Sequence, residues 1–152
     1  MDRQNEHEGS WIDPRIETLP SKIDGLGLFA KESISKDEVV IIWRGEIMSL
    51  ADIKKGLARP MSVVEIAEGV FLGGLKDDAK DPDEDMNHSC DPNVWFHDEV
   101  TLIARRDIYP GEEIVIDYAM FNGGQLGDLD SVLPFECNCG ASLCRHRIIS
   151  DD

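Results

Sequence analysis

The chain contains 152 residues, which suits one domain with a modest hydrophobic core and leaves no room for two. It carries 31 acidic and 15 basic residues, so its formal net charge is -16. Such an acidic surface repels phosphate backbones and attracts basic partners, which argues against direct binding to nucleic acid. The longest apolar run, Val39 to Trp43, is far shorter than the roughly 18 residues of a membrane span.

The N-terminal segment is polar and lacks the apolar region of a signal peptide. Residues 1–14 are therefore expected to form a flexible tail. We expect the protein to be intracellular, in the cytoplasm or nucleus, and not secreted. In a reducing compartment, the four cysteines are better interpreted as metal ligands than as disulfides.

Strand-like segments dominate the rest of the chain. They are rich in β-branched residues and are bounded by turns. The clearest are residues 38–48, 100–108 and 113–118. Helical spacing occurs over residues 50–57, with Ser49 as the expected N-cap. Many short strands with few helices predict a mainly β (α+β) domain with irregular connections.

A glycine-rich turn, Gly25-Leu26-Gly27, precedes an apolar segment near the start of the chain. Its spacing differs from that of a phosphate-binding loop, because Ala30 stands where the third glycine would and no helix signal follows. Taken alone, the pattern indicates a tight turn where the backbone approaches another group closely.

The acidic residues are concentrated in residues 77–85, where six of nine positions are Asp or Glu. This segment leads directly into Asn87-His88-Ser89-Cys90. Side chains of neighbouring residues diverge, so His88 is badly placed to act as a base for Ser89 or Cys90, and no nucleophile elbow flanks them. The sequence therefore argues against a hydrolase.

Three cysteines near the C-terminus, Cys137, Cys139 and Cys144, form a C-x-C-x4-C cluster. A glycine within it allows the chain to curl around one metal ion. Tetrahedral zinc needs four ligands, and this cluster supplies three. From spacing alone, the fourth ligand is either the distant Cys90 or His146, which follows Cys144 by two residues.

The segment from Gly111 to Tyr118 reads GEEIVIDY and runs from a turn into a strand. Because side chains alternate along a strand, Ile116 and Tyr118 share one face and Asp117 lies on the other. A tyrosine at the end of a strand is, by itself, more typical of a core residue than of a catalyst.

In order and in kind, five segments of this chain resemble the SET-domain family of protein-lysine methyltransferases. They are GLGLFA, WRGEIM, NHSCDPN, GEEIVIDY and, as a post-SET zinc tail, FECNCGASLCR. The resemblance covers about residues 15–149. It implies a SET-domain fold of several small β-sheets with a pseudoknot and few short helices. The SET domain would span residues 15–121, followed by a linker over 122–134 and the post-SET tail over 135–152.

The resemblance also implies a site for S-adenosylmethionine. The residues it would place against this cofactor are Gly25, Leu26, Gly27, Asn87, His88 and Tyr118, the first three through their backbone. Tyr118 would also be the catalytic tyrosine. Ile116 and Phe71 would line the substrate channel. For the metal, it implies zinc bound by Cys90, Cys137, Cys139 and Cys144, in preference to His146.

The function implied by the resemblance is methyl transfer to a lysine of a basic protein such as a histone. The alternative is a catalytically inactive SET scaffold that binds basic peptides, and the presence of Tyr118 with Asn87 and His88 favours the enzyme. A zinc-stabilised interaction domain without cofactor would leave the GLGLFA and NHS matches unexplained. The chain departs from the family at Glu84 and Asp85, where an Arg-aromatic pair is common, and at Ile116, where many members have Phe or Tyr.

Overall fold

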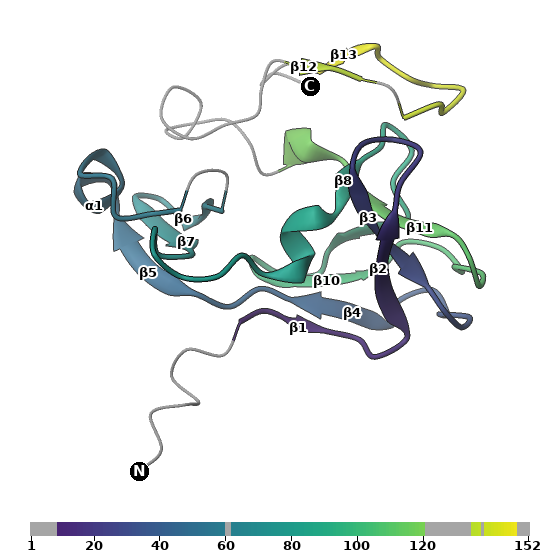
Figure 1. The fold of residues 1–152 in the computed structure, drawn as a ribbon, viewed down its shortest axis with the longest axis horizontal. Helices are drawn as coiled ribbons and strands as arrows, with labels where there is room; N and C mark the ends of the chain where they lie inside the picture. The colour runs from purple at the N-terminus through teal and green to yellow at the C-terminus, as the bar shows by residue number, and fades with distance from the viewer. Residues whose placement is uncertain (1–8, 60–61, 121–134, 138, 149–152) are drawn as a thin grey trace.

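The computed structural model describes residues 9–59, 62–120, 135–137 and 139–148 (Figure 1). Within these ranges, short strands form four small sheets, accompanied by one short α-helix and two 3-10 helices. The expectation of a mainly β fold with several small sheets and few short helices is therefore confirmed. No helix in the described ranges is long and apolar enough to cross a membrane.

The first sheet is antiparallel and has the strand order β1-β4-β10-β9. Its strands are β1 (Trp11–Ile12), β4 (Val39–Ile42), β10 (Thr101–Ala104) and β9 (Val94–Phe96). Leu102 lies at its centre, opposite Ile41 on one side and Phe96 on the other, and is completely buried. Strand β1 falls inside the segment expected as an N-terminal tail, so Trp11 and Ile12 of that segment are part of this sheet.

The second sheet carries most of the candidate site residues and has the order β2-β3-β11-β8. Its strands are β2 (Ile16–Pro20), β3 (Leu26–Ala30), β11 (Glu113–Ile116) and β8 (Asn87–His88). Strand β8 pairs in parallel with β11, whereas the other pairings are antiparallel. Beyond β8, Asn93 continues the contact: its side chain donates to the Glu113 carbonyl (2.7 Å) and accepts from the Val115 N–H (2.9 Å). Residues 87–93 are thus held along β11.

The third sheet, β5-β7-β6, forms a smaller lobe with α1 (Figure 1). Its elements are β5 (Glu46–Ser49), α1 (Leu50–Lys54), β6 (Val64–Ala67) and β7 (Val70–Gly73). The expected N-cap is confirmed, because Ser49 and Asp52 form a reciprocal capping box. The helix ends earlier than expected, at Lys54, and the chain then turns at Gly56 with a φ of 79°.

The strand expected over residues 38–48 is divided into β4 and β5, which belong to different sheets. Gly45, in the connection, lies so close to Gly73 that an added Cβ would stand 2.5 Å from the Gly73 carbonyl oxygen. A side chain at Gly45 would therefore separate β5 from β7. The strand pattern of the sequence did not reveal this change of sheet.

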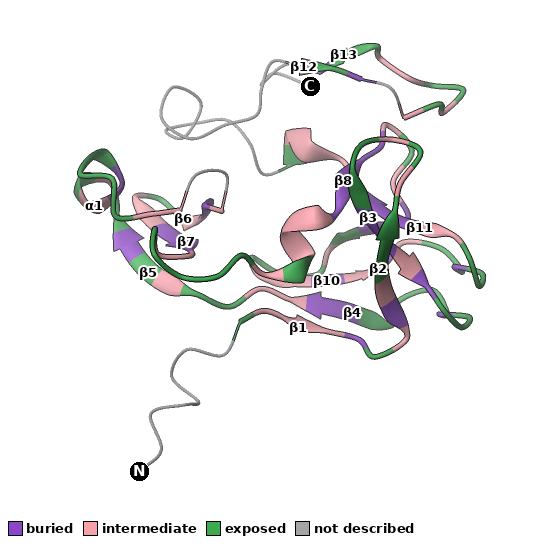
Figure 2. Cartoon of the chain, in the orientation of Figure 1, coloured by how far each residue is buried: buried purple, intermediate pink, exposed green. Residues whose placement is uncertain are grey.

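Two hydrophobic clusters correspond to the two lobes. The larger one lies between the first and second sheets, and Ile41, Leu102, Ile114 and Ile116 are among its completely buried members. The smaller one contains Met48, Ile53, Val63 and Phe71. In Figure 2 buried residues are seen along β8, in the middle of β4 and in the second half of β5.

The remaining elements are η2 (Pro82–Asp85), η3 (Tyr118–Met120), β12 (Phe135–Glu136) and β13 (Arg147–Ile148). In sequence, η2 is separated from β8 by one residue, and η3 begins shortly after β11 ends. Strands β12 and β13 pair with each other and enclose the C-terminal cysteines. The linker expected over residues 122–134, and Phe121 before it, lie outside the described residues.

Candidate active site and metal centre

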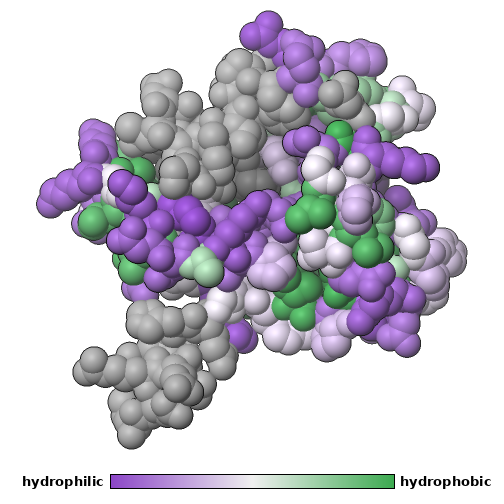
Figure 3. All heavy atoms as spheres, in the orientation of Figure 1, coloured by the Kyte–Doolittle hydropathy of each residue, from purple (hydrophilic) through white to green (hydrophobic). Residues whose placement is uncertain are grey.

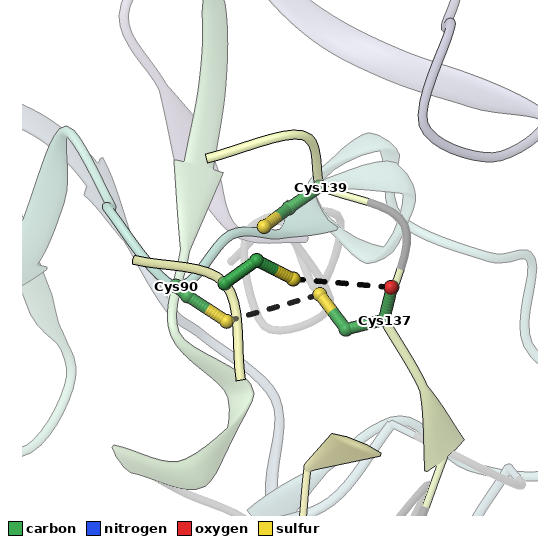
Figure 4. Close-up of side chains that lie close together, drawn as sticks. Cys90, Cys137 and Cys139 are labelled. Carbon is green, nitrogen blue, oxygen red and sulfur yellow. Dashed lines mark hydrogen bonds between the residues drawn. The ribbon is translucent and has the colours of Figure 1, made fainter. Parts of the chain in front are cut away.

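Four cysteine side chains converge on one point. The Sγ atoms of Cys90, Cys137, Cys139 and Cys144 all lie within 4.8 Å of one another. Cys90 follows β8, whereas the other three lie between β12 and β13, so the cluster joins the tail to the second sheet. Figure 4 shows three of the sulfur atoms pointing toward one another, with Cys90 and Cys137 in contact at 3.8 Å.

This donor set fits a tetrahedral metal ion. Zinc–sulfur bonds of about 2.3 Å in a tetrahedron place the sulfur atoms about 3.8 Å apart, close to the Cys90–Cys137 separation. Backbone N–H groups also point at the sulfurs: Arg145 donates to Cys90 (3.4 Å) and His146 to Cys144 (3.3 Å). Such N–H···S contacts favour thiolates over thiols. The cluster can therefore hold a metal, with Cys90 in the position that His146 would otherwise take.

The thiols of the cluster differ in acidity when no cation is present. Burial raises the pKa of the Cys137 thiol. For Cys139, burial acts in the same direction, but hydrogen bonds from the backbone of Cys90 and Ala141 outweigh it and lower the pKa to about 6. Several thiolates at this separation repel one another, so a bound cation is needed before all four can be deprotonated together.

Asn87 holds the glycine-rich turn in place. Its Nδ2 donates to the carbonyl oxygens of Asp24 and Leu26, both at 3.0 Å, and to Glu113 Oε2 at 2.8 Å. The side chain is buried, and its amide hydrogens are directed at protein acceptors. Its predicted contact with a cofactor stays a prediction, while its observed role is to fix the turn formed by residues 24–26.

Glu113 is a functional candidate that the sequence did not single out. Its carboxylate accepts from the Ser21 hydroxyl at 2.7 and 2.9 Å, in addition to the Asn87 amide. An added Cβ at Gly27 would lie 2.4 Å from Glu113 Oε2, so glycine at that position gives the carboxylate its space. Glu113 stands in GEEIVIDY, but its pairing with a turn about ninety residues earlier leaves no trace in local spacing.

The turn itself is accessible. Gly25 has a φ of 43°, a left-handed conformation that favours glycine, and no atom of the described residues lies within 4 Å of the position where its Cβ would be. The next residue, Leu26, is 49% exposed. Backbone groups of Gly25 and Leu26 can therefore be approached from outside.

His88 lies between the cysteine cluster and Tyr118. Its ring is buried, and Nδ1 accepts a hydrogen bond from the Tyr118 N–H at 3.0 Å. With Nδ1 as the acceptor, the neutral ring carries its proton on Nε2, which faces Cys90 Sγ at 3.4 Å. Contact with a cofactor was the predicted role of His88. The observed contacts connect the metal cluster to the tyrosine.

Tyr118 is the first residue of η3 and not the end of a strand, because β11 stops at Ile116. Its hydroxyl donates to the Met86 carbonyl oxygen at 2.5 Å. Burial raises the pKa of Tyr118 to about 12, and the negative charges of Asp24, Glu113 and Asp85 act in the same direction. The hydroxyl therefore stays protonated at neutral pH and acts as a hydrogen-bond donor and not as a base.

A cavity of about 150 Å³ lies between η2 and the smaller lobe. Tyr118, Met86 and Trp43 contribute to its lining, together with residues of β6 and β7. Of the two residues predicted to line a substrate channel, Ile116 is buried in the larger cluster and Phe71 in the smaller one. Neither belongs to the lining that the described residues form, so their contact with a substrate stays a prediction.

The cavity is acidic along η2, since Asp81, Asp83 and Glu84 line it. Burial raises the pKa of Asp83 to about 7, and the charges of Asp81 and Glu84 add to this effect. Asp83 Oδ1 is buried and has no hydrogen-bond partner within the described part of the chain. Figure 3 shows hydrophilic residues in a band across this face, over the segment leading to η2.

The two positions that depart from the family pattern are engaged in ion pairs. Glu84 accepts from Arg59 through both carboxylate oxygens, at 2.7 and 3.2 Å, and Arg59 also lines the cavity. Asp85 pairs with Lys80 at 2.7 Å. The positive charge beside η2 thus comes from Arg59 and Lys80.

Comparison with known proteins identifies relatives along most of the chain. A Schizosaccharomyces pombe protein, "Histone-lysine N-methyltransferase, H3 lysine-4 specific", is 33% identical over 141 residues, covering 83% of this chain and 14% of the relative. A Cryptococcus neoformans protein of the same name is 28% identical over 144 residues, covering 82% of this chain and 9% of the relative. The chain thus spans a small part of these relatives.

Among solved structures, the methyltransferase domain of human histone-lysine N-methyltransferase SETMAR has a similar fold, with a TM-score of 0.62 at 21% identity. The likeness covers 87% of this chain and 56% of that one. Residues 25–119 match the SET domain, and they include the glycine-rich turn, residues 87–90 and Tyr118. Because this match spans more than half of the sequence, the chain belongs to the SET-domain family.

Proposed function

We propose that this protein is an S-adenosylmethionine-dependent protein-lysine N-methyltransferase that acts on a basic protein such as a histone. The observation that carries the proposal is the placement of Tyr118: its protonated hydroxyl is fixed by the Met86 carbonyl at the wall of a cavity lined by acidic residues. The SET-domain match and the names of the relatives support the same activity.

The cavity suits a lysine side chain. An amine attacks a methyl donor only when it is neutral, and at pH 7 deprotonating a lysine of pKa near ~10.4 costs about 4 to 5 kcal/mol. The excess negative charge of the chain would attract the cationic substrate. Apolar surface from Trp43, Val64 and Leu72 would then disfavour the charge on the amine once it is enclosed.

Tyr118 would act by alignment. A hydroxyl whose pKa lies near 12 is a poor proton acceptor at neutral pH, but its oxygen lone pairs can receive a hydrogen bond from the incoming amine. Its own proton is committed to Met86, so the oxygen is held in one position. Fixing two reacting groups in this way lowers the barrier by removing their freedom of motion.

The residues around the glycine-rich turn fit S-adenosylmethionine, which would supply an electrophilic methyl group on a sulfonium centre. Gly25, Leu26 and Gly27 would contact it through their backbone, of which Gly25 and Leu26 are exposed and Gly27 is buried, with Asn87 and Glu113 holding the turn. We include His88 and Tyr118 in the same site. The four cysteines would hold a structural zinc ion, since four thiolates leave no open coordination position.

A basic segment of a protein is the substrate class that the charge favours. The formal net charge is -16, so a Lys- or Arg-rich segment would be attracted before it binds. At the cavity itself, Asp81, Asp83 and Glu84 stand beside two arginines, Arg44 and Arg59. Histones are the substrates in the names of the relatives, and we propose the same class, and an intracellular site of action, for this chain.

The direct test is transfer of a labelled methyl group from S-adenosylmethionine to a panel of basic proteins, with the modified residues identified by mass spectrometry. We expect transfer to lysine side chains, and its loss in Tyr118→Phe. Binding of basic peptides without methyl transfer to any protein would contradict the proposal and indicate an inactive scaffold.

A further inference from the structure

One residue of the tail reaches from the metal cluster to the segment that carries Tyr118. Arg145 directly follows Cys144, and its backbone N–H donates to Cys90 Sγ at 3.4 Å. Its side chain extends to the second sheet, where Nη2 lies 2.8 Å from Asp117 Oδ1. Arg145 and Asp117 are 28% and 18% exposed, so their ion pair is largely shielded from water.

Asp117 shapes the backbone on which Tyr118 stands. Its Oδ1 accepts from the Ala119 N–H at 3.0 Å, and its carbonyl accepts from the Met120 N–H at 3.0 Å. These two bonds close the turn of η3 around Tyr118. The same oxygen, Oδ1, receives the Arg145 guanidinium, so the tail contacts the atom that organises this turn.

A second connection joins the same two places. The Tyr118 N–H donates to His88 Nδ1, and His88 Nε2 faces Cys90 Sγ. Both connections therefore end at Cys90, one through Arg145 and the other through His88. Burial opposes the charge of the guanidinium, but its attraction to Asp117 outweighs this and raises the pKa of Arg145. A cluster of thiolates would add to that attraction.

We propose that Arg145 is a positioning residue that couples the four-cysteine metal site to Tyr118 through Asp117. Metal binding brings together the tail and Cys90, which places Arg145 on Asp117 and thereby fixes η3. The coupling itself concerns the position of Tyr118, and its effect on turnover rests on the proposed function. Because such coupling is reciprocal, breaking the ion pair also weakens the hold on the metal.

The chain offers a readout that does not depend on activity. Its two tyrosines are Tyr118 and Tyr109, and Tyr109 is 60% exposed. Fluorotyrosine incorporation should therefore give two 19F resonances, which Tyr109→Phe assigns. The resonance of Tyr109 then serves as the internal reference. Chelation of zinc from the parent protein should shift or broaden the Tyr118 resonance and leave that of Tyr109 unchanged.

The test compares zinc-loaded Arg145→Gln with zinc-loaded Arg147→Gln. Arg147 is an exposed arginine two residues later on β13, so its replacement changes the same charge on the same tail. We expect Arg145→Gln to move the Tyr118 resonance toward its zinc-free position. It should also lower kcat by roughly ten- to a hundredfold with smaller changes in KM, as expected when a reacting group is displaced. Arg147→Gln should behave as the parent.

An unchanged Tyr118 resonance in zinc-loaded Arg145→Gln would overturn the coupling, whether or not the protein methylates lysine. If that variant does not retain zinc, Asp117→Asn decides, because it removes the charge but keeps an oxygen for the Ala119 N–H. In that variant, a parent-like Tyr118 resonance overturns the proposal and a displaced one supports it. Absence of methyl transfer by the parent would instead contradict the proposed function and leave the resonance test intact.

Discussion

Replacing Glu113 with glutamine should weaken cofactor binding more than it weakens the fold. The Glu113 carboxylate accepts hydrogen bonds from the Ser21 hydroxyl and the Asn87 amide, and Asn87 in turn holds the carbonyls of Asp24 and Leu26. Glutamine keeps one acceptor oxygen but loses the charge, and its NH2 group would face another donor. Either Ser21 or Asn87 must then give up its partner.

The magnitude follows from these contacts. Hydrogen bonds to a charged group contribute about 1.5–3 kcal/mol and neutral ones about 0.5–1.5 kcal/mol, so the exchange should cost about 1 to 2 kcal/mol. If the turn must be ordered before the cofactor binds, this cost appears in the dissociation constant, as a roughly 5- to 30-fold loss of affinity. The hydrophobic clusters are not altered, so the melting temperature should fall by a few degrees at most.

The assay is calorimetric binding of S-adenosylhomocysteine to zinc-loaded protein, with the melting temperature measured alongside. Glu112→Gln is the matched control, because Glu112 precedes Glu113 and pairs with Arg106 near the surface at 3.1 Å. Equal affinity of the two variants for S-adenosylhomocysteine would refute the idea that Glu113 orders the turn for binding. A large fall in melting temperature for Glu113→Gln alone would show that its role is in the fold.

Four further outcomes are expected. By metal analysis, Cys90→Ser should contain less than one zinc ion per chain, whereas His146→Ala should keep the full zinc content. The reverse result would favour a metal site formed within the tail alone. Tyr118→Phe should keep the fold and most of the affinity for the cofactor, but its kcat should fall strongly because the hydroxyl held by Met86 is lost. An unchanged kcat would show that Tyr118 has no catalytic role. In the folded protein the pKa of the Asp83 carboxyl is about 7, whereas in the unfolded chain the same group ionises near pH 4. The free energy of unfolding therefore falls as the pH rises from 4 to 7. Melting temperatures of Asp83→Asn should therefore exceed those of the parent increasingly over this range, and a constant difference would contradict the assignment. Because Ile116 is smaller than an aromatic residue and its side chain cannot hydrogen-bond, we expect di- or trimethyl-lysine as the product. Mass spectrometry at long reaction times would contradict this if the product remained monomethyl-lysine.

The sequence predicted those features that depend on local residue types. The capping box at Ser49 follows from side-chain chemistry over three residues and was found as expected. The gathering of Cys90 with the tail cysteines was implied by the family resemblance, because spacing alone left His146 as an equal candidate. The first case rests on local residue types, and the second on the resemblance.

Contacts between distant polar side chains could not be predicted in this way. Glu113 and Ser21 are separated by 92 residues, and no local spacing relates them. The strand expected over residues 113–118 ends at Ile116, because Asp117 turns the chain into η3 by accepting the Ala119 N–H. Periodicity identifies the strand, but the turn depends on one carboxylate and on its partner Arg145, 28 residues later in the C-terminal tail.

The pair formed by Arg59 and Glu84 explains how an acidic segment can be ordered beside a cavity. The guanidinium donates to both carboxylate oxygens of Glu84 and to the carbonyls of Leu75 and Asp78, so it connects both ends of the segment. Gly74 makes room for it, since a Cβ there would lie 2.3 Å from Arg59 Nη2. Each partner is 15% exposed, so removing one would leave the other charge buried without compensation. Glu84 is paired with Arg59 and Asp85 with Lys80, and the buried Asp83 keeps its proton up to a pKa of about 7. The acid of this segment that is left to meet a cationic substrate at the cavity is therefore Asp81, at the N-cap of η2.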